Sequence, residues 1–167
     1  MERIVAWCAP WSALFDHSKW ISGTVTGVHI MALVFGGGLA IAADRLTLRV
    51  PSDASARREQ LHEVRSVHGI VLVNVILLFV SGVLLAIADV ETFLESPIFW
   101  TKLVLVAALV VNGAFLTRVE RQLSERADAD VSVLHNESWS HVRFFAWSSV
   151  FLWTATSVVG IVLSNAA

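Results

Sequence analysis

The chain has 167 residues, of which 56% are hydrophobic and 16% are charged, and its formal net charge is −2. A soluble domain of this composition would expose too much apolar surface, so the composition indicates a membrane protein. No basic surface with interleaved aromatic residues suggests nucleic acid as a partner, and the single cysteine excludes a disulfide within the chain.

Residues 1–20 are predicted to form an interfacial segment. Pro10, Asp16 and Lys19 leave an apolar run that is too short for a signal peptide, and no small-residue cleavage site follows it. Trp7 and Trp11 would anchor this segment where lipid meets water.

Four apolar stretches come next, at residues 21–43, 67–88, 98–116 and 144–163. Each can cross a hydrocarbon core about 30 Å thick, which takes roughly 20 helical residues. The predicted fold is therefore all-α, with residues 1–167 forming a single domain that is an integral membrane antiparallel four-helix bundle. A helix is expected to begin ahead of the second span, with Ser52 or Asp53 as its N-cap.

Two loops carry nine of the twelve Lys and Arg residues. By the positive-inside rule these basic loops lie in the cytoplasm, and both termini lie on the outer or periplasmic side of the membrane. The nine residues are Arg45, Arg49, Arg57, Arg58 and Arg65 after the first span, and Arg118, Arg121, Arg126 and Arg143 after the third.

Small residues in the first span predict close helix packing. Gly23 and Gly27 are separated by three positions, and Gly36, Gly37 and Gly38 lie one after another. Such residues let a second helix backbone approach.

An offset of 73 residues relates the two halves of the chain and predicts two repeated two-helix units, unless the match arose by chance. If the halves are related by an axis along the membrane normal, paired residues lie at similar depths. The offset pairs His62 with His135, His68 with His141, and His29 with Lys102.

His68 falls on an apolar seam with alternating spacings of three and four residues, from Leu61 to Leu85. The same offset predicts that His141 faces the bundle on a fourth-helix seam through Phe144, Phe151 and Val158. His62 and His135 lie about 120° away from these seams.

These histidines suggest a b-type haem held by His68 and His141, with Arg65 and Arg143 near its propionates. Two alternatives remain open. The histidines can be interfacial residues that bind loop carbonyls, or His62, His68, His135 and His141 can hold zinc or copper, with Glu63 and Glu137 as oxygen donors.

His29 and Lys102 form a second candidate site in the outer half of the bundle, for a quinone head group or an anion. The alternative is that Lys102 extends to the membrane surface, with Asp89, Glu91 or Glu95 as counter-charge.

Several short motifs carry a resemblance to known proteins. They are the run from Val28 to Arg49, Ser81 to Leu85, Ser96 to Lys102, and Asn112. In these the chain resembles an uncharacterised family of bacterial four-helix inner-membrane proteins and, more distantly, four-helix membrane b-type cytochromes. The resemblance implies the fold and a location in the bacterial inner membrane.

We therefore expect a membrane electron-transfer protein that carries haem b and exchanges electrons with a quinone or a protein partner. The runner-up is a cofactor-free accessory or scaffolding subunit of a larger membrane complex, which docks through the small residues of the first span. Metal handling, of copper or zinc, comes third. No nucleophile paired with a base, no P-loop and no dinucleotide fingerprint is found, so hydrolytic and phosphoryl chemistry are not expected.

Overall fold

A computed structural model describes residues 2–129, 134 and 136–166, and this part of the chain contains helices and no strands. In chain order the elements are α1 (Glu2–His17), α2 (Lys19–Ala32), η1 (Leu33–Gly37), α3 (Gly38–Arg49), α4 (Ala54–Ala88), α5 (Val90–Glu95), α6 (Pro97–Ala129) and α7 (Asn136–Ala166).

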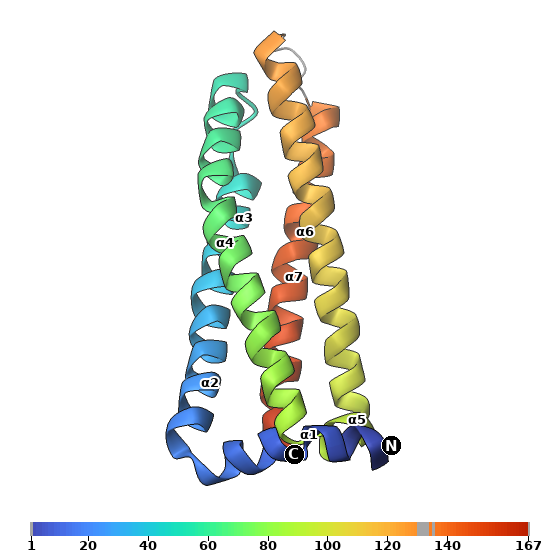
Figure 1. Cartoon of the computed structure of the whole chain (residues 1–167). Coiled ribbons are helices and arrows are strands. Elements are labelled where there is room, and N and C mark those ends of the chain that lie inside the picture. Colours follow the sequence, from blue (N-terminus) through green and yellow to red (C-terminus); the bar gives the residue numbers. More distant parts are fainter. Residues whose placement is uncertain (1, 130–133, 135, 167) are drawn as a thin grey trace.

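Four long apolar helices form the body of the molecule (Figure 1). The first is continuous from α2 through the π-helical turn η1 to α3, and α4, α6 and α7 are the others. By length and composition, each can cross a membrane, and the four predicted spans fall within them. Their outward side chains are apolar, with Phe79, Val104 and Phe151 among the most exposed. The expected all-α bundle is confirmed at this level.

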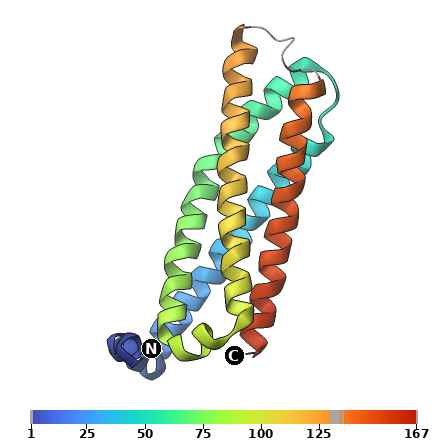
Figure 2. The ribbon, with the colours of Figure 1, turned by 90° about the vertical axis from the view of Figure 1, so that its right-hand side faces the viewer.

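The short helices α1 and α5 lie at the same end of the bundle as both termini, and α1 runs across that end in Figure 1 and is viewed nearly end-on in Figure 2. The indole Nε1 of Trp11 donates a hydrogen bond of 2.9 Å to the carbonyl oxygen of Leu84, which ties α1 to α4. Residues 2–17 are therefore helical and attached to the bundle.

Asp53, rather than Ser52, caps α4. Its carboxylate accepts a hydrogen bond of 3.1 Å from the backbone N–H of Ala56 and another from the hydroxyl of Ser55. The bond from Ser55 and that from Ala56 lower the pKa of Asp53, because both favour the ionised carboxylate. The cap fixes where the helix begins, well before the apolar span.

The helices pack as two hairpins, α2–α3 with α4 and α6 with α7, and the main link between the hairpins is the contact of α3 with α7. At the basic-loop end they enclose an apolar core that includes Leu61, Leu116, Leu123, Leu134 and Trp139. The buried guanidinium of Arg57 lies 5.2 Å from the ring centre of Trp139 and donates a 2.5 Å hydrogen bond to the carbonyl of Leu134. Two paired hairpins are compatible with a repeat, although the duplication itself stays a prediction.

Two adjacent glycines of η1 bring the first span against two different helices. A Cβ on Gly36 would lie 2.6 Å from the Cβ of Asn74 on α4, and a Cβ on Gly37 would lie 2.9 Å from the ring of Trp153 on α7. Neighbouring residues of a helix point about 100° apart, so each glycine serves a different contact. Here the predicted close packing by small residues is confirmed.

For the other glycines of the first span the packing prediction is wrong within this chain. A Cβ added to Gly23, Gly27 or Gly38 would have no neighbouring atom within 4 Å. Close approach of a glycine to another helix is therefore confined to Gly36 and Gly37 in the first span.

The predicted seam of α4 is confirmed at its start, where Leu61 and Val64 are buried, and its later residues, His68 to Leu85, are half-buried. The seam predicted for the fourth helix is wrong, because Phe144, Phe151 and Val158 are exposed. The face of α7 that packs inside begins with the large ring of Trp139 and is offset from the predicted one. Its buried residues are Trp139, Val142, Ala146, Ser149, Trp153 and Thr156.

We expect Gly37→Ala to destabilise the protein by about 1–3 kcal/mol, because the added methyl group overlaps the ring of Trp153. The matched control is Gly38→Ala, which meets no neighbour and should be neutral or stabilising by up to about 1 kcal/mol. Thermal unfolding in detergent measures both. Equal effects of the two variants would contradict the packing described here.

Candidate functional site

Two carboxyl groups are buried inside the bundle toward the basic-loop end. Asp44 of α3 is 6% exposed and Glu120 of α6 is 7% exposed. The hydroxyl of Ser149 on α7 hydrogen-bonds the carboxyl of Asp44, whose Oδ2 atom is buried with no hydrogen-bond partner among the described residues. Asp44 and Glu120 interact electrostatically across the interior. Ionisable groups within an apolar helical bundle are costly to bury, so they mark a candidate functional site.

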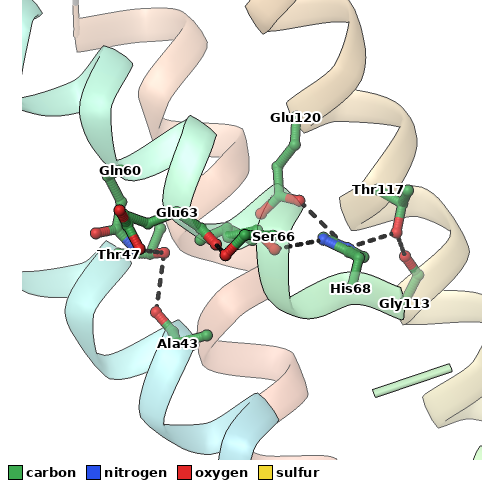
Figure 3. A network of polar contacts seen from close by, with 10 residues as sticks. Ala43, Thr47, Gln60, Glu63, Ser66, His68, Gly113, Thr117 and Glu120 are labelled. Carbon is green, nitrogen blue, oxygen red and sulfur yellow. Dashed lines mark hydrogen bonds and ion pairs between the residues drawn. The ribbon is translucent and has the colours of Figure 1, made fainter. Parts of the chain in front are cut away.

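His68 of α4 points toward α6 and lies beside Glu120 (Figure 3). Its Nδ1 lies 2.9 Å from the carbonyl oxygen of Val64, and its Nε2 lies 2.9 Å from the hydroxyl oxygen of Thr117 and 3.5 Å from Oε2 of Glu120. We call Asp44, His68 and Glu120 the acid–histidine cluster.

The contacts of His68 place a proton on Nδ1. The carbonyl of Val64 can only accept, so Nδ1–H donates to it. Nε2 lies at hydrogen-bond distance from the hydroxyl of Thr117, which also lies 2.8 Å from the carbonyl oxygen of Gly113. Nε2 is thus the ring nitrogen that faces both Thr117 and the buried carboxyl of Glu120.

Helical periodicity explains how the cluster is assembled. Asp44 follows Gly37 by about two helical turns on α3, and Ser149 precedes Trp153 by about one turn on α7. The packing of Gly37 against Trp153 therefore also brings Asp44 close to Ser149. On α6 one buried face contains Asn112, Leu116, Glu120, Leu123 and Ala127.

A second polar contact joins α3 to α4 close to the cluster (Figure 3). The side-chain amide of Gln60 donates a 3.0 Å hydrogen bond to the hydroxyl oxygen of Thr47, which donates to the carbonyl of Ala43 at 3.0 Å. These bonds hold the end of the first span against the start of α4.

His29 of α2 and Lys102 of α6 both lie in the other half of the bundle and interact electrostatically. The ring of His29 packs over Gly82 of α4, and its Nδ1 lies 2.9 Å from the hydroxyl of Ser81. The ammonium of Lys102 packs over Gly160 of α7. Their binding of a quinone or an anion stays a prediction.

The described residues do not fit a haem held by His68 and His141. A low-spin haem needs two neutral imidazoles that share one interior space. Both ring nitrogens of His68 already have partners, and the prediction that His141 faces the bundle is wrong, because this residue is exposed. Arg65 and Arg143 are exposed as well. Haem binding is a prediction from the sequence that these contacts do not support.

The zinc or copper alternative gains no geometric support. Within the described ranges no group of three or more His, Cys, Asp or Glu side chains is arranged to hold a metal ion. His62 is exposed, while His135 and the side chain of Glu137 lie outside the described part of the chain.

The sequence reasoning missed Asp44 and Glu120. The apolar stretches end at residues 43 and 116, so Asp44 and Glu120 lie beyond the predicted spans, in the predicted loops. A signal was present, because Glu120 continues the periodicity of Asn112 and Leu116 toward Leu123. Extending the helical face past the apolar window would have placed this carboxyl inside.

Comparison of the chain with protein-family models, with curated proteins and with solved structures finds no match. The resemblance to a family of bacterial inner-membrane proteins therefore stays a prediction, and the chemistry of the site is what bears on function.

We expect His68→Ala to lower the free energy of unfolding by about 1–2 kcal/mol, because it removes the bonds to Thr117 and Val64 and the partner of Glu120. His141→Ala should change it by less than about 0.5 kcal/mol, since this side chain is exposed. Unfolding in detergent measures the stability of both variants, and an absorption spectrum of each shows whether a haem is bound. A low-spin haem spectrum lost in both variants would overturn this assignment and restore the bis-histidine site.

Proposed function

We propose that the chain is a four-span integral membrane protein of the bacterial inner membrane, with its basic loops in the cytoplasm, and that it binds and exchanges a proton at the acid–histidine cluster. The burial of Asp44 and Glu120 from two different helices, with His68 beside Glu120, carries this proposal.

The charges of the cluster support proton binding. Two ionised carboxylates in a low-dielectric interior repel each other, and the basic side chain of His68 lies within ion-pair distance, at 3.5 Å from Glu120. A proton held by the acidic pair removes the excess negative charge. Ionisable side chains inside membrane bundles commonly mark proton pathways for the same reason.

The exposure of the cluster supports exchange with water. The side chain of His68 is 34% exposed, whereas that of Glu120 is only 9% exposed. A histidine ring can take up a proton at one nitrogen and release one from the other, so His68 can pass a proton between the surface and the buried carboxyl at 3.5 Å. Proton exchange of this kind serves redox and transport chemistry alike.

Infrared difference spectra between acidic and alkaline pH should show the C=O stretching band of a protonated carboxylic acid. We expect Glu120→Gln to abolish or strongly reduce the band, because the variant removes one member of the pair that holds the proton. Glu125→Gln is the matched control on the same helix, since Glu125 is exposed and pairs with Arg121.

A band that persists unchanged in both Glu120→Gln and Asp44→Asn would show that the proton resides elsewhere. No band at any pH in the wild type would remove the proposed proton site altogether.

The membrane topology has its own test, in a background in which Cys8 is replaced by serine. A cysteine in place of Ser55, near the start of α4, should be shielded from an impermeant thiol reagent in intact cells, because the basic loops lie inside. A cysteine in place of Glu91, in α5 at the opposite end, should be labelled. Both side chains are exposed, so the reverse pattern of labelling would invert the proposed orientation.

A further inference from the structure

The ammonium group of Lys102 lies among the helices. A Cβ placed on Gly160 of α7 would be 3.5 Å from Nζ and 3.6 Å from Cε of Lys102. The end of the lysine side chain therefore packs directly against the backbone of α7 at this glycine. Lys102 also interacts electrostatically with His29 of α2.

No acidic side chain balances this charge among the residues that the structure describes. The acidic residues at this end include Asp89, Glu91 and Glu95, all exposed. Ion pairs between described side chains join His68 to Glu120 and Arg121 to Glu125, and neither includes Lys102. An uncompensated cation in this position is costly, and an anionic ligand offsets the cost.

His29 adds a second group with defined chemistry. The hydroxyl of Ser81 lies 2.5 Å from the carbonyl oxygen of Leu77 and 2.9 Å from Nδ1 of His29, so Nδ1 has a partner within the bundle. In the neutral tautomer with the proton on Nδ1, Nε2 accepts from a ligand hydroxyl. When the ring is protonated, Nε2 becomes a donor to an anionic oxygen.

We propose that Lys102 and His29 form a binding site for an anionic phosphate group, which an acidic phospholipid or free phosphate can supply. Lys102 pairs with a phosphate oxygen, and His29 bonds a second oxygen or a hydroxyl of the same head group. Gly160 leaves room for Lys102 against α7, and Gly82 leaves room for His29 against α4.

The depth of Lys102 suits a lipid head group. Lys102 lies five residues after Pro97, where α6 begins, which corresponds to about 7–8 Å along a helix. The head-group region is several ångströms deep on each side of the hydrocarbon core, and both side chains are half-exposed. The inference rests on the membrane location proposed above, which incorporation into nanodiscs tests separately.

The test uses the full chain in nanodiscs of phosphatidylcholine alone, of phosphatidylcholine with phosphatidylglycerol, and of phosphatidylcholine with inorganic phosphate in the buffer. Native mass spectrometry counts retained phosphatidylglycerol, and thermal unfolding reports stabilisation. Wild type should retain phosphatidylglycerol and unfold at a higher temperature with it. Lys102→Met should weaken retention by about tenfold or more, because the charge-assisted bond is lost.

Lys19→Met is the matched control, because Lys19 is an exposed lysine at the same end of the bundle. It should behave as wild type. His29→Ala keeps the lysine and should weaken retention severalfold, which tests the site even if Lys102→Met does not fold. Stabilisation by inorganic phosphate that competes with phosphatidylglycerol would support the site and assign it to a soluble ligand. Equal lipid retention by wild type, Lys102→Met and His29→Ala would overturn the proposal.

Discussion

The close approach of the first span to α4 and α7 at Gly36 and Gly37 is the constraint on which the rest of the structure depends. The two hairpins of the bundle meet chiefly where α3 packs on α7, and Gly37 against Trp153 begins that contact. The contact between Gly37 and Trp153 is local, but the regular periods of α3 and α7 continue it along both helices. Two turns further along α3, Asp44 contacts Ser149. The π-helical turn at residues 33–37 coincides with this junction, and π-helical turns are frequently found at functional sites.

Polar side chains strengthen the contacts between helices while the outer surface stays apolar. Single hydrogen bonds join α2 to α4 through His29 and Ser81, α3 to α4 through Thr47 and Gln60, α4 to α6 through His68 and Thr117, and α6 to α7 from Asn112 to the carbonyl of Phe145. Bonds of this kind contribute about 0.6–2 kcal/mol each between helices in a membrane. Their distribution over several depths explains how a bundle with little buried apolar surface keeps a single arrangement.

The four long helices, the start of α4 and the buried start of its seam could be predicted from the sequence, because apolar length, capping residues and a period of 3.6 residues report directly on them. The face of α7 could not. It was inferred from an offset that pairs His141 with His68, and the large rings of Trp139 and Trp153 place the buried face elsewhere. The cluster was missed for a related reason, since Asp44 and Glu120 lie past the apolar windows on helices that continue beyond them. His29 and Lys102 could be identified from the sequence because an ionisable residue within an apolar stretch has few polar neighbours that could serve as its partners.

The two ionisable sites lie in opposite halves of the bundle, and the central claim concerns the buried pair. A double-mutant cycle of Asp44→Asn, Glu120→Gln and the double variant measures their coupling directly from unfolding free energies at neutral pH. The account predicts that the effects of the single variants are not additive, with a coupling of about 0.5 kcal/mol or more, because removing either carboxyl relieves the repulsion that the other experiences. Additive effects within about 0.3 kcal/mol would show that Asp44 and Glu120 act independently and would contradict the shared proton site.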